Sequence, residues 1–240
     1  MSVTHLPYQV DPKSNRFHRY EQLWKETAIG LLKKHASSLA SWTHLDFGCG
    51  RGETMKMASD LGMITHGTDI DPQCLELSAK YGTVSPLSDM GPLAQFGEKS
   101  YDLVTCFHVL EHMPNPKETL QSLAKIARKY VLVAVPNLSA FHDLLRPRSR
   151  WDIPVNEGHL QAWDHAHFRN LAEKHCGLGI VEWGHDAVIL PPFTHWIENL
   201  LGPKPAIALE TGPLKWLFPF ASLSIIALME PVGLPGPRRP

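Results

Sequence analysis

The chain has 240 residues, which is enough for one sizeable hydrophobic core and too few for two ordinary domains. Its formal net charge of -1 at pH 7 lacks the basic excess that binding to a phosphate backbone requires, so we expect no nucleic-acid partner. The four cysteines form no CxxC pair and no disulfide framework, which is typical of a protein kept in a reducing cytoplasm.

Two stretches of the sequence are candidates for a signal peptide or a membrane span. The N-terminal "MSVTHLPYQVDPKSNRFHRY" has neither an apolar core nor a cleavage-site pattern, so we do not expect a signal peptide. The late segment "LKWLFPFASLSIIALMEP" is interrupted by Pro219 and is short for a membrane span, so we interpret it as a buried strand with its approach. We expect a cytoplasmic protein without stable membrane insertion, and the oligomeric state stays open.

The first expected element is an amphipathic helix between residues 20 and 39, where apolar residues recur at helical spacing. Short apolar runs then alternate with helical patterns. Strands are expected at residues 43–49, 63–70, 83–88, 101–109 and 130–136. Helices are expected between them, at residues 53–62, 72–82 and 116–129. This alternation predicts an α/β protein with a Rossmann-like, doubly wound and mostly parallel sheet.

Beyond residue 137 the pattern is looser. We expect an irregular excursion, a helix at 165–177 and two further strands, at 179–190 and 222–231. A Pro- and Trp-rich insertion separates these last two strands. We therefore divide the chain into an N-terminal helical segment over 1–40 and one domain over 41–235, with substrate-side insertions at about 138–165 and 191–220.

The stretch "LDFGCGRGETM" places three glycines directly after the first strand, where ligands bind in doubly wound sheets. Glycines let the chain turn tightly and let a ligand approach the backbone without meeting a Cβ. Their spacing is Gly48-x-Gly50-x-Gly52, which differs from the GxGxxG loop of nicotinamide and flavin enzymes. Asp46 lies two residues ahead of the loop.

Acidic residues follow the next two strands. Asp69 ends the second strand, at the distance from the glycine loop at which an acid can reach ribose hydroxyls. Asp71 precedes Pro72 and is better placed as a helix N-cap. Asp89 follows the weak third strand, where a short acid could accept from an exocyclic amino group. Each feature alone also has a purely structural interpretation, but they occur in order on consecutive strand ends.

These residues resemble a known family. "LDFGCGRGETM", "GTDIDPQCLELSAK", "SDMGPL" and "YDLVTCFHVLEHMPNPKETLQSL" are similar to the successive motifs of class I S-adenosylmethionine-dependent methyltransferases. The subgroup looks like the ubiquinone-biosynthesis-type O-methyltransferases, and "GHLQAWDHAHFRNLAEKHCGL" resembles a later segment of that subgroup. "SLSIIALMEP" resembles the antiparallel last strand that separates this fold from dehydrogenases. The motifs are specific for the cofactor and uninformative about the substrate.

The resemblance implies roles for the matching positions. Asp46 orients the loop and meets the methionine amino group of S-adenosylmethionine. Asp69 binds both ribose hydroxyls. The remaining cofactor-binding positions that the resemblance implies are Gly48, Gly50 and Gly52 around the methionine, Ile70, Asp89 and Met90 around the adenine, and Phe107 at the fourth strand end.

Methyl transfer from a sulfonium is an in-line displacement, so the protein mainly supplies alignment and a dry pocket. A base is needed only where the nucleophile loses a proton, and His108 and His112 are the candidate catalytic residues for that role. Glu-His after this strand also looks like a structural feature of such folds.

A metal site is not expected. His165 and His167 have HxH spacing, but the segment enters a helix, on which residues two apart face away from each other. Asp164 is more simply a helix cap. We expect His159 and Trp163 on the substrate side.

The predicted function is therefore transfer of a methyl group to a small molecule, with an oxygen nucleophile slightly favoured. Transfer to nitrogen or carbon, or to a lipid-linked or sugar substrate, stays open. A protein that binds S-adenosylmethionine without catalysis is the alternative of another class. A nicotinamide dehydrogenase is disfavoured by the glycine spacing and the last strand.

Overall fold

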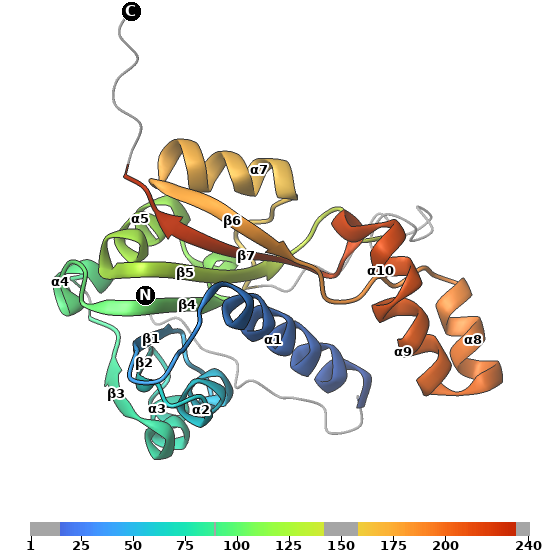
Figure 1. The fold of residues 1–240 in the computed structure, drawn as a ribbon, viewed down its shortest axis with the longest axis horizontal. Coiled ribbons are helices and arrows are strands. Elements are labelled where there is room, and N and C mark those ends of the chain that lie inside the picture. Colours follow the sequence, from blue (N-terminus) through green and yellow to red (C-terminus); the bar gives the residue numbers. More distant parts are fainter. Residues whose placement is uncertain (1–14, 89, 142–157, 234–240) are drawn as a thin grey trace, which may run out of the picture.

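The computed structural model describes residues 15–88, 90–141 and 158–233, and these residues form a seven-stranded sheet with helices on both faces (Figure 1). The strand order is β3-β2-β1-β4-β5-β7-β6. The strands are β1 (Thr43–Phe47), β2 (Ile64–Asp69), β3 (Thr83–Pro86), β4 (Tyr101–Phe107), β5 (Ala127–Pro136), β6 (Leu178–Gly184) and β7 (Ser224–Pro231).

Strand directions agree with the expected fold class. β1, β2, β3, β4 and β5 pair in parallel, while β7 runs antiparallel to both of its neighbours, β5 and β6. The order reverses between β1 and β4, and in open α/β sheets ligands bind at the carboxyl ends of the strands at such a reversal. The Rossmann-like, mostly parallel sheet with an antiparallel last strand is confirmed.

Helices cover the sheet on two sides. The helices and helical turns up to β6 are α1 (Asn15–His35), α2 (Glu53–Asp60), α3 (Pro72–Ser78), η1 (Ala79–Tyr81), α4 (Pro92–Phe96), η2 (Leu110–His112), α5 (Pro116–Ile126), α7 (His165–Asn170) and η3 (Leu171–His175). On one face, α1 and α2 bury Trp24, Leu32 and Ala58 against the strands. On the other, α5 and α7 bury Leu120 and Phe168. The strongly apolar β4 and β5 are buried on both faces, as central parallel strands are.

Several expected boundaries shift. The helix expected at 116–129 ends at Ile126, and Ala127 already pairs with Tyr101 as the first residue of β5. The strand expected at 179–190 ends at Gly184. Beyond it, Asp186 Oδ1 accepts hydrogen bonds from the N–H groups of Ala187 and Ser224, at 2.8 and 3.3 Å, in place of ladder partners.

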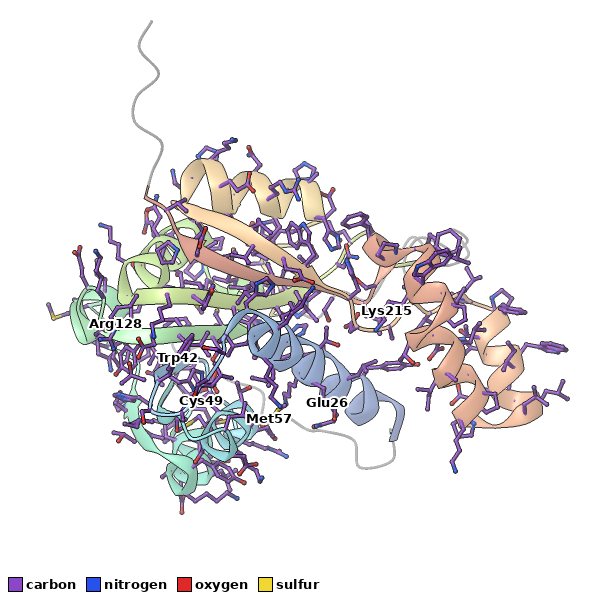
Figure 2. All side chains as sticks on the ribbon, in the orientation of Figure 1. Glu26, Trp42, Cys49, Met57, Arg128 and Lys215 are labelled. Atoms are coloured by element: carbon purple, nitrogen blue, oxygen red, sulfur yellow. The ribbon has the colours of Figure 1, made fainter. Side chains whose placement is uncertain are left out.

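The insertion at 191–220 is helical. It contains α8 (Phe193–Leu201), α9 (Pro203–Thr211), α10 (Pro213–Leu217) and the turn η4 (Pro219–Ala221). These helices stand together beyond one end of the sheet in Figure 1, and Figure 2 places Lys215 on α10 there. The phenol of Tyr20 on α1 donates to Glu210 Oε2 on α9 at 2.7 Å, which ties this group to the rest of the fold.

The division into segments 1–40 and 41–235 stays a prediction. Most of the expected insertion at 138–165 lies outside the described residues. Among the helices of the described parts, none combines the length and the apolar character that a membrane span requires.

Candidate active site

A glycine loop joins β1 to α2 at the carboxyl end of β1, where Figure 2 labels Cys49. Gly48, Gly50 and Gly52 have positive φ angles, of 79°, 51° and 82°. A Cβ on Gly48 would clash with the side chain of Val109, so a larger residue there would have to displace that side chain or the loop. A Cβ on Gly50 would meet no heavy atom within 4 Å, so the loop faces open space at this point.

The carboxylate of Asp69 holds this loop against the end of β2. Its Oδ2 accepts a hydrogen bond from the N–H of Gly50 at 2.9 Å, and its Oδ1 accepts one from the N–H of Asp71 at 3.0 Å. The structure therefore brings the glycine loop and Asp69, the first two predicted features, into direct contact. A carboxylate oxygen can accept more than one hydrogen bond, so Asp69 also retains capacity for ligand hydroxyls.

Asp46 lies on β1 beneath the loop and is almost fully buried. The hydroxyl of Thr105 on β4 donates to its Oδ1 at 2.6 Å. Burial raises the pKa of Asp46 to about 7, against the opposing effects of the Thr105 hydrogen bond and the Lys25 charge. Asp46 therefore acts from below the loop and does not stand at its open side.

Lys25 is a residue of this site that sequence reasoning missed. It belongs to α1, is only 6% exposed, and places its Nζ 3.8 Å from Oε2 of Glu53 in the first turn of α2. Its charge also lowers the pKa of Asp46. A buried lysine is rare, but in the sequence Lys25 is one polar residue on an otherwise amphipathic helix, with no spacing that points to the loop.

The remaining expected cofactor-binding residues differ in exposure. Ile70 follows β2 and is exposed, as a residue that covers a ligand ring would be before the ligand binds. Met90 is also exposed, at the start of the turn before α4. Phe107 is buried at the end of β4, where its ring packs edge-on against Trp24 at 5.1 Å. Asp89 lies outside the described residues.

His108 directly follows β4 in a left-handed conformation with φ of 54°, which is uncommon for a residue with a side chain. Its Nδ1 lies 3.2 Å from Oε1 of Glu111, and Trp24 packs against the ring at 4.8 Å between centroids. Its Nε2 is buried and has no hydrogen-bond partner among the described residues. The strained backbone of His108 thus holds the imidazole with Nδ1 oriented by Glu111 and with Nε2 available for another partner.

His112 lies one turn further on and meets a distant segment. Its Nδ1 is 2.8 Å from the carbonyl oxygen of Gly158, and its ring packs edge-on against His159 at 4.8 Å. Together with Glu111, these two histidines place three possible metal-ligand atoms within 4.8 Å of one another. Sequence reasoning had paired neither Glu111 nor His159 with His112.

The other histidine cluster is structural in its described contacts. Asp164 caps α7 by accepting from the N–H of His167 at 2.8 Å, as expected, and its Oδ2 contacts the His167 ring at 2.8 Å. His165 packs edge-on against Trp183 instead. Trp163, expected on the substrate side, is buried and packs against Phe168 in the core.

A protein family described as a methyltransferase domain matches residues 13–182, which is more than half of the chain. The chain belongs to this methyltransferase family. The glycine loop, Asp69, His108 and the segment around His159 all lie within the matched residues. The expectation of a methyltransferase is confirmed at the level of the family.

The chain also resembles individual methyltransferases. It is 28% identical over 109 residues to the ubiquinone biosynthesis O-methyltransferase of Idiomarina loihiensis, a match covering 40% of this chain and 42% of the relative. The corresponding protein of Burkholderia vietnamiensis is 29% identical over 140 residues, or 51% of this chain and 59% of the relative. The chain therefore spans about half the length of these curated relatives.

Among solved structures, a magnesium protoporphyrin IX methyltransferase from Synechocystis, crystallised with bound S-adenosylhomocysteine, has a TM-score of 0.62. The alignment covers 91% of this chain and 89% of that one, at 17% identity. At this identity the likeness establishes the shared fold alone.

Proposed function

We propose that this chain transfers the methyl group of S-adenosylmethionine to a small molecule, with oxygen as the favoured acceptor atom. The observation that carries the donor site is the open backbone at Gly50, tied to Asp69 by a 2.9 Å hydrogen bond. When bound there, S-adenosylmethionine supplies an electrophilic methyl group on a positively charged sulfur.

The residues at this edge fit that cofactor. The glycine loop admits the methionine part, and the carboxylate of Asp69 accepts from the two ribose hydroxyls. The exposed side chains of Ile70 and Met90 would contact the adenine, and Phe107 would line the cofactor from the end of β4. Asp46, buried under the loop, holds the loop in place and attracts the methionine amino group from below.

His108 is the proposed general base for a hydroxyl acceptor. Glu111 accepts from the His108 Nδ1–H, which leaves Nε2 as the atom that takes the hydroxyl proton. The buried carboxylate also stabilises the imidazolium that forms. The named relatives are O-methyltransferases, which supports oxygen over nitrogen or carbon as the acceptor.

A lipid-linked acceptor is the second candidate, and a specific surface favours it. The segment from α8 to η4 exposes several large apolar side chains beside the sheet end. They are Phe193, Trp196, Leu200, Leu201, Trp216, Leu217, Phe218 and Phe220. A lipid tail or a bilayer surface would bury this area, whereas a small polar acceptor would leave it in water.

Direct binding followed by turnover tests the proposal. Equilibrium dialysis of the full chain with S-adenosylmethionine and, separately, with NAD should show binding of the first alone. Asp69→Ala should weaken S-adenosylmethionine binding at least tenfold, because it removes the ribose acceptor and releases Gly50. Asp60→Ala, on the exposed end of α2, is the matched control and should bind normally.

Turnover then separates an enzyme from a binding protein. The chain is incubated with cell extract and a donor carrying an isotope-labelled methyl group, and products are sought by mass spectrometry. His108→Ala should reduce labelled product about 100-fold while cofactor binding is retained. Binding without any labelled product supports the non-catalytic alternative, and binding of NAD alone contradicts the proposal.

A further inference from the structure

We propose that Glu111, His112 and His159 bind one divalent transition-metal ion, at a site separate from the glycine loop. Their ligand atoms lie within 4.8 Å of one another. Two imidazole nitrogens and one carboxylate oxygen form a donor set that suits Zn²⁺, Fe²⁺ or Co²⁺ better than Mg²⁺ or Ca²⁺. The sequence predicted no metal, because these residues come from separate and irregular parts of the chain.

Glu111 has an unsatisfied carboxylate oxygen. The side chain is fully buried, and its Oε1 lies 3.2 Å from Nδ1 of His108. Its Oε2 is equally buried but has no hydrogen-bond partner among the described residues. Burying a carboxylate oxygen without a partner is costly, and a bound cation removes that cost. His108 thus fixes the carboxylate so that one oxygen is left for an ion.

His112 presents a free ring nitrogen. The carbonyl oxygen of Gly158 can only accept a hydrogen bond, so the contact at 2.8 Å requires the proton to be on Nδ1 of His112. The neutral ring then carries its lone pair on Nε2, the atom that binds a metal. A backbone carbonyl as the partner of the other nitrogen is the usual arrangement around metal-binding histidines.

The backbone holds the third ligand in place. The N–H groups of Leu160 and Gln161 donate to the carbonyl oxygen of Glu111, at 2.7 and 3.1 Å. These two bonds fix the segment that carries His159 against η2. The ring of His159 is thereby held next to the ring of His112, at 4.8 Å between centroids.

The three ligand atoms need only a small movement to bind one ion. Two ligands of a tetrahedral ion bound at about 2.1 Å lie roughly 3.4 Å apart. The present separation of up to 4.8 Å closes by rotation of the His159 side chain, which is partly exposed, while His112 keeps its bond to Gly158. Three protein ligands leave at least one coordination position open. A further role rests on the proposed function: an acceptor oxygen would enter that position, next to His108.

Metal binding is measured without cofactor or acceptor, so its outcome is independent of the proposed function. The full chain is treated with a chelator, dialysed and titrated with Co²⁺, while visible absorption reports nitrogen and oxygen coordination. Zn²⁺ titration by calorimetry gives the stoichiometry. We expect one ion per chain, and at least tenfold weaker binding in each of His112→Ala and His159→Ala. His175→Ala, an exposed histidine elsewhere, is the control and should bind as the unmodified chain does.

Glu111→Gln should also weaken binding, because an amide oxygen is a poorer ligand than a carboxylate. Glu111 is buried, so circular dichroism must show that this variant folds. If Glu111→Gln does not fold, His112→Ala and His159→Ala alone test the metal site, because the native side chains at these two positions reach the surface. The proposal is overturned if the unmodified chain shows no saturable binding of one ion, or if both histidine variants bind Co²⁺ as tightly as the control.

Discussion

Gly48 shows how the absence of one Cβ shapes the loop. Its φ of 79° and the close approach of the Val109 side chain to the position of a Cβ are independent obstacles to any other residue. Val109 follows His108 at the β4 end, so the glycine lets the two strand ends meet. The spacing of the loop is thus a packing requirement as well as a ligand requirement.

Gly48→Ala should destabilise the protein by about 2 to 4 kcal/mol. Alanine is strained in the left-handed conformation of this position, and its Cβ would overpack against Val109. Cofactor binding should weaken in the same variant. Gly30→Ala is the matched control, since Gly30 lies in the middle of α1 with no atom near its Cβ position. It should stabilise the protein by up to about 1 kcal/mol. Urea unfolding measures both, and equal effects in the two variants would contradict the prediction.

Asp46 makes stability depend on pH. Burial raises its pKa to about 7 in the folded chain, whereas an unfolded aspartate titrates near pH 4 (about 3.9). The folded state binds this proton more tightly, so the stabilisation is complete below pH 4 and is lost as the pH rises through 7.

From pH 5 to pH 8, the free energy of unfolding should therefore fall by about 2 to 3 kcal/mol more in the unmodified chain than in Asp46→Asn. The asparagine side chain keeps an oxygen that accepts the hydrogen bond from Thr105, but this side chain has no group that titrates. Asp60→Asn, an exposed site, should follow the unmodified chain. Denaturant unfolding at several pH values measures this, and a parallel profile for Asp46→Asn would contradict it.

At the scale of elements, α1 contributes both to the core and to the candidate site. Its apolar face packs on the sheet through residues such as Trp24, Ala28 and Leu32. The same helix carries Lys25 under the glycine loop and places Trp24 against the ring of His108. A helix that precedes the sheet in sequence therefore supports both the donor loop and the proposed base.

Leu32→Ala should destabilise the protein by about 2 to 5 kcal/mol, because Leu32 is fully buried between α1 and the strands. Leu200→Ala, at a leucine of α8 that is 62% exposed, should change stability by less than about 0.5 kcal/mol. Thermal or urea unfolding compares the two. A large loss in the α8 variant would mean that another part of the molecule covers that helix.

At the scale of the whole molecule, the parallel sheet explains why the predicted donor-site residues lie at one edge. The carboxyl ends of β1, β2 and β4 meet there, so Gly50 bonds to Asp69 and Val109 packs against Gly48 although these residues are far apart in sequence. Strand order and the right-handed crossover rule make this convergence predictable from alternation alone. Asp71 and Asp164 were also predictable as caps, because a cap bonds to backbone within three residues.

Other features depend on contacts that no local pattern encodes. The Pro- and Trp-rich composition of the insertion at 191–220 did not indicate its three helices, of which α9 and α10 pack on a small cluster that contains Val188, Leu214 and Ala221. The early start of β5 at Ala127 follows from pairing with Tyr101, which overrides the helical pattern of that segment.

By itself, the sequence determined the fold class, because hydrophobic periodicity acts through local backbone geometry, and it indicated the family through the resemblance of its motifs. Only the tertiary structure decided which groups are buried and which distant groups meet. It placed Lys25 near Asp46, and it joined His159 to Glu111 and His112 through backbone hydrogen bonds. Burial and long-range approach set pKa values and possible ligands, and they arise from packing of the whole chain.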